Sequence, residues 1–405
     1  MSANEVSGSS RPPAYRADHR MSELDGIRGV ACLVVLFDHC VIGLFPPGWI
    51  PGYYRLTAWL LGGVDLFFVL SGLLIGGILL DHRSAANYFK VFWTRRVARI
   101  MPVYYLLLLT FYAALLAKPL LTAPWLDGYL FKDMMPLWTY PLFVQNFAQS
   151  VDGGDGGARW VASTWSLAIE EQFYLLLPPL VYVMGRRRLA VLAAACIAVA
   201  PLVRGHLWQV TGHWAAGYFL LPGRMDSLMF GLLGALTLRT APAIAALRRH
   251  RRSLDLLSLA LVVALSGNVL PAIGAMMPNT VSFPVRSLDF TLRSALFYYA
   301  IMRVFLVGEC TLYRRVLSSR PLVGAGTISY ALYMYHPVVN GLLHGALFAD
   351  DPRITDVPRF LAALAVMAIS VGLAWLSTTY FELPIRRLSH RVKYRRETGP
   401  GALPG

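Results

Sequence analysis

The sequence predicts an all-α polytopic membrane protein with about ten transmembrane helices and both termini in the cytoplasm. Hydrophobic residues make up 56% of the 405 residues and charged residues only 15%, a composition far from that of an ordinary soluble domain. Apolar runs of about 20 residues, long enough to cross roughly 30 Å of hydrocarbon, recur along the whole chain. Most of the Lys and Arg residues fall in loops on one side of these runs, which predicts their orientation.

Ten apolar runs are long enough to be interpreted as transmembrane helices. They lie at approximately 24–44, 59–81, 100–117, 163–184, 189–203, 217–238, 254–270, 288–307, 322–347 and 358–380. The segment 134–148 is too short to span a membrane and is expected to be re-entrant or interfacial.

The basic residues predict how the chain is oriented and divided. Cytoplasmic loops carry an excess of Lys and Arg, and most of the 37 such residues lie on the side of the two tails. We therefore expect a polar cytoplasmic tail at 1–22, a transmembrane domain at 23–384 and a basic cytoplasmic tail at 385–405. The net charge of +15 is explained by short basic loops facing anionic membrane lipid, so no nucleic-acid partner is expected. The first apolar run is too long for the hydrophobic part of a cleavable signal peptide.

Cysteine usage excludes two kinds of site. Cys32, Cys40, Cys196 and Cys310 lie within or at the edge of predicted spans and lack the spacing of metal ligands, so neither disulfides nor a bound metal is expected. No stretch has the character of a soluble catalytic domain. Any catalytic chemistry is therefore expected from polar groups within the spans, where ionisable side chains are costly and tend to be functional.

The first predicted span carries Arg28 near its inner end and His39 in its outer half. With a turn of about 100° and a rise of about 1.5 Å per residue, both side chains fall on one helix face, roughly 16 Å apart. Such a histidine fits two interpretations about equally: a buried side chain hydrogen-bonded to a neighbouring helix, or a functional group. Polar residues in the other spans favour the second interpretation.

Three arginines, Arg95, Arg96 and Arg99, come just before the third predicted span. Arg96 and Arg99 are three positions apart at the start of a helix and would present two guanidinium groups on one side, a geometry suited to phosphate. Arginines at a cytoplasmic helix end are also common topology anchors. The cluster by itself therefore does not define a ligand site.

Carboxylates occur in two further spans. In the fourth, Ser166, Glu170 and Tyr174 are spaced by four and share one polar face. The sixth carries Arg224 and Asp226 at a similar depth from the outer side. The alternative to a functional site is an ion pair that serves packing, for example between Glu170 and Arg224.

The ninth predicted span carries a polar stripe along one face. It consists of Ser329, Tyr333, His336, Asn340 and His344. Such a stripe is expected to line a cavity or a packed polar seam rather than to face lipid. Because His336 precedes a proline, its role is expected to be local to the helix kink.

Seven elements, taken in order, resemble the acyltransferase 3 family of bacterial integral-membrane O-acyltransferases. They extend over about 22–387 and read LDGIRGVACLVVLFDH, GGVDLFFVLSG, RRVARIMPVY, TWSLAIEEQFYLLLP, GRMDSLMFG, ISYALYMYHP and FELPIRR. The family's Arg and His of the first helix fall on Arg28 and His39, and its R-x-x-R motif falls on Arg96 and Arg99. Its W-S-L-x-x-E motif falls on 165–170.

The resemblance implies an acetyl-CoA-dependent O-acetyltransferase of the bacterial cytoplasmic (inner) membrane. It would move an acyl group, usually acetyl, from acyl-coenzyme A to a hydroxyl of a cell-envelope glycan or lipid-linked saccharide. In some members the acceptor is a secreted small molecule such as a macrolide. Others carry a fused extracytoplasmic hydrolase-like domain, and none is expected here because the chain ends soon after its last predicted span. The residues expected to bind the donor are Arg28, Arg95, Arg96 and Arg99.

His39 is the expected general base, which activates the acceptor hydroxyl for direct attack on the thioester. Neutral imidazole, which titrates near pH ~6.5, suits that task. Its neighbour Asp38 departs from the family pattern and points about 100° away around the helix, so Glu170 or Asp226 is the expected orienting group. A covalent acyl-enzyme through a residue such as Ser71 is the less favoured alternative.

A proton-coupled transporter is the rival function, because intramembrane His, Glu and Asp side chains are also typical of carriers. The sequence contains no recognisable inverted repeat and no matched pair of interrupted helices, which are frequent signs of transporters. The enzyme is therefore the preferred interpretation.

Overall fold

The computed structural model describes residues 21–120, 123–153, 157–267, 279–308 and 310–395, without the side chains of 279–286, and these residues form helices and no strand. The α-helices are α1 (Ser22–Cys40), α2 (Tyr53–Leu61), α3 (Gly63–Asp81), α4 (Tyr88–Ala117), α5 (Gln145–Val151), α6 (Thr164–Val183), α7 (Arg186–Thr211), α8 (Ala215–Phe219), α9 (Leu221–Thr237), α10 (Ala241–Arg249), α11 (Arg251–Ser266), α13 (Asn279–Leu306), α14 (Leu312–Leu317), α15 (Arg320–Phe348), α16 (Val357–Leu376) and α17 (Leu383–Ser389). The predicted all-α class is confirmed for this part of the chain.

Each of the ten predicted apolar runs coincides with one or two of these helices. In the described residues, five helical segments are long and apolar enough to cross a membrane, or six if one bent pair counts as a single span. The five are Ser22–Leu44, Tyr53–Asp81, Tyr88–Leu120, Arg186–Thr211 and Val357–Ser389, and the bent pair, with an angle of 105°, is Leu221–Thr237 with Ala241–Arg249. The chain is thus a polytopic membrane protein, and the number of ten spans stays a prediction.

The helix that carries the third predicted span begins earlier than expected, because α4 starts at Tyr88 rather than near residue 100. The residues before that point include Lys and Arg, which lower the hydropathy but are good helix formers. No helix breaker precedes Pro102. Consequently Arg96 and Arg99 lie two to three turns inside a helix instead of in front of it.

The predicted ends of the domains fall partly outside the described residues. Residues 1–20 and 396–405 are not described, so the predicted tails and the side of the membrane on which they lie remain predictions. The predicted boundary between 384 and 385 falls within α17.

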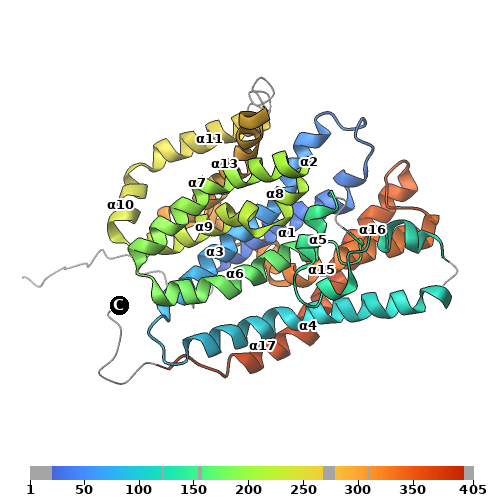
Figure 1. The fold of residues 1–405 in the computed structure, drawn as a ribbon, viewed down its shortest axis with the longest axis horizontal. Helices are drawn as coiled ribbons and strands as arrows, with labels where there is room; N and C mark the ends of the chain where they lie inside the picture. Colours follow the sequence, from blue (N-terminus) through green and yellow to red (C-terminus); the bar gives the residue numbers. More distant parts are fainter. Residues whose placement is uncertain (1–20, 121–122, 154–156, 268–278, 309, 396–405) are drawn as a thin grey trace, which may run out of the picture.

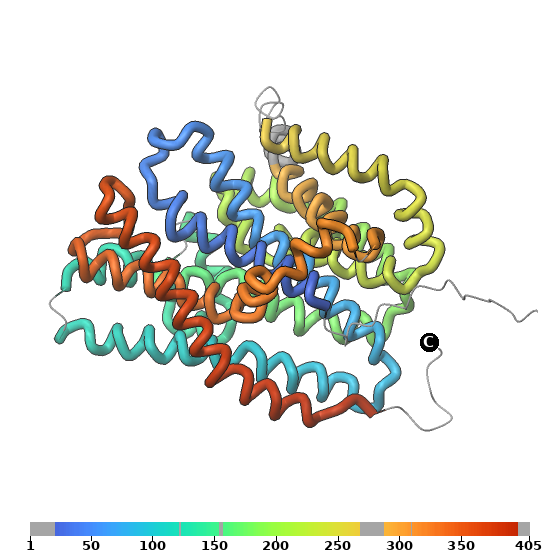
Figure 2. The backbone as a smooth tube through the Cα atoms, turned by 180° about the vertical axis from the view of Figure 1, so that it is seen from behind, coloured from blue at the N-terminus to red at the C-terminus, as the bar shows by residue number. Residues whose placement is uncertain are grey.

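The helices form a bundle in which α1 and α15 lie side by side near the centre (Figure 2). In Figure 1, α4 and α17 run along the lower edge, while α10 and α11 lie at the opposite edge. Helix α3 packs against α9, and α7 packs against both α9 and α13. Elements far apart in sequence therefore meet in the middle of the molecule.

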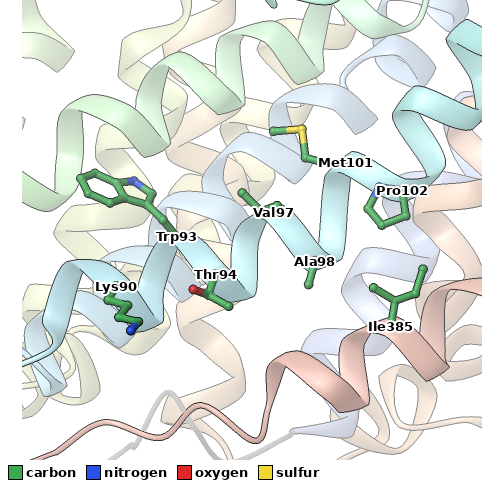
Figure 3. Close-up of a pocket in the computed structure, with 8 residues that line it drawn as sticks. All are labelled: Lys90, Trp93, Thr94, Val97, Ala98, Met101, Pro102 and Ile385. Atoms are coloured by element: carbon green, nitrogen blue, oxygen red, sulfur yellow. The ribbon is translucent and has the colours of Figure 1, made fainter.

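The outer surface of α4 carries an open groove beside α17 (Figure 3). It is lined by Lys90, Trp93, Thr94, Val97, Ala98, Met101, Pro102 and Ile385. None of these is a predicted site residue, and most are apolar. The groove is thus a feature of the apolar exterior of a membrane-capable helix.

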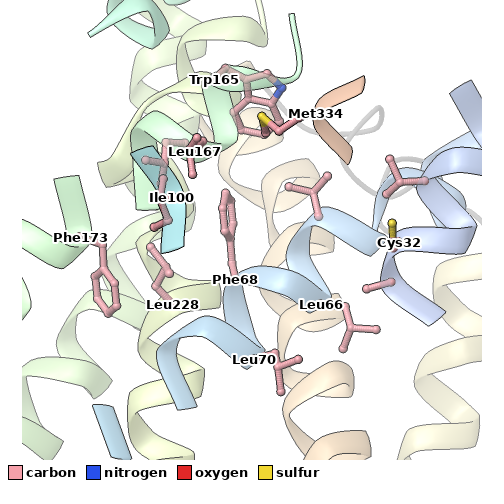
Figure 4. Packing of buried hydrophobic residues seen from close by; sticks show 14 of the residues in the cluster. Cys32, Leu66, Phe68, Leu70, Ile100, Trp165, Leu167, Phe173, Leu228 and Met334 are labelled. Carbon is pink, nitrogen blue, oxygen red and sulfur yellow. The ribbon is translucent and has the colours of Figure 1, made fainter. Parts of the chain in front are cut away.

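Part of the apolar core lies where side chains of α1, α3, α4, α6, α9 and α15 pack together (Figure 4). Phe68 of α3 is 1% exposed, and its ring meets that of Trp165 edge-on at 6.3 Å between centroids. Ile100, Leu167 and Leu228 belong to the same cluster. This packing positions the polar faces of α3, α4 and α6 around a shared interior space.

Close approach of α1 and α15 depends on glycine. A side chain on Gly29 would overlap the carbonyl oxygen of Leu322, and one on Gly326 would overlap that of Asp25. Only a residue without a Cβ lets two helix backbones approach this closely, as in small-residue contacts between membrane helices. The contact sets the register with which the outer halves of the two helices face each other.

Candidate active site

A cavity of about 450 Å³ lies between α1, α3, α4, α6, α15 and α17. Its polar lining residues are Asp25, Arg28, Ser71, Arg96, Arg99, Ser166, Glu170, Tyr174, Thr327, Ser329, Tyr330, Tyr333, Glu382, Arg386 and His390. Four of the predicted site residues, namely Arg28, Arg96, Arg99 and Glu170, therefore share one space. His39, Asp226 and Arg95, all within the described part of the chain, are not among the lining residues.

One part of the cavity wall is strongly cationic. Arg28 donates to Asp25 at 2.7 Å, whereas Arg96 and Arg99 make no ion pair or hydrogen bond with any residue that the structure describes. Partly buried guanidinium groups without carboxylate partners are costly unless an anion neutralises them. The geometry thus suits an anionic ligand.

The end of α17 adds the cation Arg386 and the imidazole of His390 to this wall. Burial, followed by the charges of nearby arginines, with Arg95 first, lowers the pKa of His390. Its imidazole is therefore held in the neutral form more strongly than an exposed histidine would be. The sequence-based site did not include these two residues, because only the packing of α17 against α4 brings them to the cavity.

Arg95 points away from the cavity. Its Nη2 donates to the carbonyl oxygen of Val392 at 3.0 Å, and its guanidinium lies 5.3 Å from the ring centroid of Tyr394. These contacts attach the segment after α17 to α4. The structure thus separates Arg95 from Arg96 and Arg99, with which the sequence grouped it.

A chain of hydrogen bonds crosses the cavity from α6 to α3. Tyr174 donates to a carboxylate oxygen of Glu170 at 3.1 Å, and its hydroxyl oxygen lies 2.6 Å from Ser71 Oγ. Because the single hydroxyl proton of Tyr174 goes to the carboxylate, Ser71 must be the donor to Tyr174. The sequence predicted the shared face of Glu170 and Tyr174 but not the partner on α3.

Helix α15 contributes Tyr333, which joins the cavity to a pair of histidines. Its hydroxyl lies 2.9 Å from Ser166 Oγ, and its ring centroid is 6.3 Å from that of Phe67 and 5.8 Å from that of His336. Tyr333 and Phe67 both line the cavity. His336 therefore lies directly behind this wall.

His39 of α1 faces His336 rather than a carboxylate. Its Nδ1 lies 2.8 Å from His336 Nε2, and the two rings stack with centroids 5.1 Å apart. His336 Nδ1 lies 3.0 Å from the carbonyl oxygen of Leu332. The residue next to His39 Nδ1 is thus His336, and not Glu170 or Asp226 as expected. The role of His336 is also not confined to its own helix turn, since it contacts α1.

Asp226 belongs to a separate buried cluster. It pairs with Arg204 at 2.9 Å and accepts a hydrogen bond from Thr291 at 2.6 Å. Nearby, Arg224 pairs with Asp65 at 2.5 Å. These contacts connect α3, α7, α9 and α13, so the carboxylate expected near His39 is engaged in packing contacts.

Comparison with known proteins identifies the same family as the sequence motifs. Residues 21–379 match the acyltransferase domain that defines the acyltransferase 3 family. The chain belongs to this family. No solved structure shows significant similarity to the chain.

Relatives of the chain are named as O-acetyltransferases, and two of the three named here as peptidoglycan O-acetyltransferases. YrhL of Bacillus subtilis (strain 168), named as a candidate peptidoglycan O-acetyltransferase, is 26% identical over 92% of the chain and 56% of its own length. Peptidoglycan O-acetyltransferase OatA of Listeria monocytogenes is 26% identical over 90% of the chain and 55% of its own length. O-acetyltransferase OatA of Staphylococcus aureus (strain NCTC 8325) is 27% identical, with coverages of 90% and 57%. The chain thus spans about half the length of the curated relatives it matches.

Within the described ranges, no group of three or more His, Cys, Asp or Glu side chains is placed to hold a metal ion. The four cysteines are free, and Cys32 and Cys40 are buried in α1.

Proposed function

We propose that the protein is a membrane-bound O-acetyltransferase of the bacterial cytoplasmic membrane. It takes an acyl group, preferably acetyl, from acetyl-coenzyme A on the cytoplasmic side and transfers it to a hydroxyl of a cell-envelope glycan or lipid-linked saccharide. The observation that carries this proposal is a cavity lined by Arg96, Arg99 and a polar wall, with the His39–His336 pair directly behind that wall. The names of two of the relatives support a glycan acceptor.

The arginines are proposed to bind the phosphates of the donor. Coenzyme A is an anion, and Arg96 and Arg99 are cations that make no hydrogen bond or ion pair in the described chain, although Arg96 also lies over the rings of Phe92 and Tyr174. Charge-assisted hydrogen bonds from guanidinium to phosphate are short and strong, contributing about 1.5 to 3 kcal/mol each. Arg28, which also lines the cavity, is held by Asp25 and would add a third cation to the same wall.

The chemical step assigned to His39 is general-base catalysis. The acceptor hydroxyl gives its proton to His39 Nε2 while its oxygen attacks the thioester carbonyl, forming a new C–O bond. The C–S bond then breaks, and the departing coenzyme A thiolate takes the proton back from the imidazolium. Proton transfer of this kind typically contributes about 10²- to 10⁴-fold to rate.

The two predicted carboxylates receive different roles in this proposal. Glu170 accepts the hydrogen bond of Tyr174, which in turn accepts that of Ser71, and so orders the wall along which the pantetheine arm of the donor would lie. Asp226 is engaged by Arg204, which supports a packing role. Ser71 donates toward Tyr174 and remains the alternative site for a transient acyl-enzyme.

The test is thioester consumption by purified protein with acetyl-CoA and a peptidoglycan fragment as acceptor. The wild-type protein should release coenzyme A thiol and acetylate the acceptor, and His39→Ala should lower the rate at least ~10²-fold while still binding coenzyme A. His250→Ala removes an exposed histidine and is the matched control.

Three outcomes would contradict all or part of the proposal. Full turnover by His39→Ala would show that His39 is not the general base. Movement of a solute across liposome membranes with no thiol release would indicate the proton-coupled transporter instead. Acetylation of a secreted small molecule but not of glycan would contradict the proposed class of acceptor.

A further inference from the structure

We infer that His336 is a positioning residue that fixes the tautomer of His39, so that Nε2 of His39 carries the free lone pair. The inference rests on the proposed function, because it matters only if His39 is the base. Nothing in the family motifs or in the names of the relatives assigns His336 a role. The argument follows protons from one hydrogen bond to the next.

The first step concerns His336 Nδ1. It lies 3.0 Å from the carbonyl oxygen of Leu332, four positions earlier on α15. A carbonyl oxygen can only accept, so Nδ1 must carry the proton. A neutral imidazole has one N–H, and Nε2 of His336 is therefore an acceptor.

The second step concerns the contact between the rings. His39 Nδ1 lies 2.8 Å from His336 Nε2, and because that nitrogen accepts, His39 Nδ1 must donate. Two imidazolium cations at this distance would repel each other, and the burial of His336, which is only 1% exposed, disfavours even one positive charge on the pair, so we take both rings as neutral in the resting state. The remaining nitrogen of His39, Nε2, is left unprotonated, which is the state that a general base requires.

The third step is why the pair stays in this arrangement. Cys32 Sγ contacts the carbonyl oxygen of Ser329 at 3.5 Å, at the same sequence separation of 297 as the two histidines. Asn340 donates to the backbone carbonyl of His39 at 3.2 Å. Helix α15 thus holds the backbone of His39 with Asn340 and the ring of His39 with His336. Fixing the backbone and orienting the ring are therefore the tasks of two different side chains.

The catalytic consequence is a preset orientation. When Nε2 takes the acceptor proton, His39 becomes an imidazolium whose Nδ1–H still donates to His336 Nε2, so His336 needs no proton change of its own. Without an acceptor at this place, both tautomers of His39 would become populated and the ring could rotate. The expected loss is in kcat, not in donor binding.

The test compares His336→Leu, which removes the acceptor, with His336→Gln, whose amide oxygen can accept from His39 Nδ1. His336→Leu should lower kcat at least ~10-fold with little change in KM for acetyl-CoA, and His336→Gln should restore most of the rate. His344→Leu is the matched control, because His344 is also buried on α15 and bonds the carbonyl four positions earlier, at 3.2 Å. It should retain turnover.

A second arm separates positioning from folding. In a His39→Ala background, adding His336→Leu should cause no further loss, because His336 acts only through His39. In wild-type protein labelled with ¹⁵N-histidine, the His39 signals should report protonated Nδ1 and unprotonated Nε2, a measurement that needs no variant.

The outcomes distinguish this inference from the proposed function. If His39→Ala is inactive but His336→Leu turns over normally, or if the NMR signals show the opposite tautomer, the role of His336 is refuted and the acetyltransferase stands. If His336→Gln folds and binds donor yet is as slow as His336→Leu, acceptance by His336 is refuted too. If His39→Ala itself is active, the proposed base fails.

Discussion

His39 and His336 are separated by 297 positions in the sequence, and so are Cys32 and Ser329, which also contact each other across α1 and α15. A constant separation along an interface means that the two helices run in the same direction. The histidine contact is therefore set by the register of the whole interface, including the glycines Gly29 and Gly326. This relationship makes the candidate site sensitive to changes far along the helices.

Gly326→Ala should destabilise the protein and slow turnover. The added methyl group would overlap the carbonyl oxygen of Asp25, and overpacking of this kind typically costs about 1 to 3 kcal/mol. Gly324→Ala is the matched control on the same helix, because nothing lies within 4 Å of a Cβ there. Thermal unfolding in detergent and the rate of thiol release measure both effects, and equal behaviour of the two variants would contradict the register argument.

Arg96→Ala combined with Arg99→Ala should weaken coenzyme A binding, because each lost charge-assisted bond costs about 1.5 to 3 kcal/mol. The loss should be larger for coenzyme A than for dephospho-coenzyme A if these arginines bind the ribose phosphate, and equal losses would move them to the diphosphate. Arg95→Ala should have a smaller effect, since its guanidinium contacts Val392 and Tyr394. Isothermal titration of the three proteins checks this, and unchanged binding in the double variant would exclude the proposed donor site.

The carboxylates Glu170 and Asp226 should respond differently to removal. Asp226→Ala leaves Arg204 buried without its partner, which typically costs about 3 to 5 kcal/mol, so its main effect should be a lower unfolding temperature. Glu170→Ala should fold normally, because the side chain faces the cavity, and should lower kcat. A stable but inactive Asp226→Ala would restore the orienting role that the sequence suggested.

Cysteine labelling should establish the membrane orientation. In a Cys310→Ser background, which removes the exposed native cysteine, Asp152→Cys should react with an impermeant thiol reagent on intact cells, and Arg187→Cys should not. Both positions are exposed and lie on opposite sides of α6. Asp152 is in an acidic loop, whereas Arg187 is in the basic sequence GRRR, which is expected on the cytoplasmic side. The wild-type Cys310 should also be protected in intact cells. Labelling of Arg187→Cys alone would show that the membrane orientation is the opposite of the predicted one, which would exclude a cytoplasmic donor at Arg96.

Hydropathy, charge distribution and motif spacing were enough to predict the helical membrane class and the family, and four of the predicted site residues share the cavity. These are local properties: the four-residue spacing of Ser166, Glu170 and Tyr174 places them on one face wherever α6 packs. Of the four arginines that the family resemblance grouped, Arg28, Arg96 and Arg99 line one cavity and Arg95 does not. The start of α4 was missed because basic residues lower hydropathy without breaking a helix.

Only the tertiary structure decided which of these polar groups meet. The sequence offered several partners for His39, and nothing local distinguishes a carboxylate on α6 or α9 from a histidine on α15. The choice depends on the close contact of α1 with α15, made at glycines ten residues before each histidine, and on the diversion of Asp226 to Arg204. The sequence by itself therefore determined the helices and their polar faces, whereas helix packing determined that His39 is paired with His336, because contacts between distant segments depend on backbone approach that no local pattern encodes.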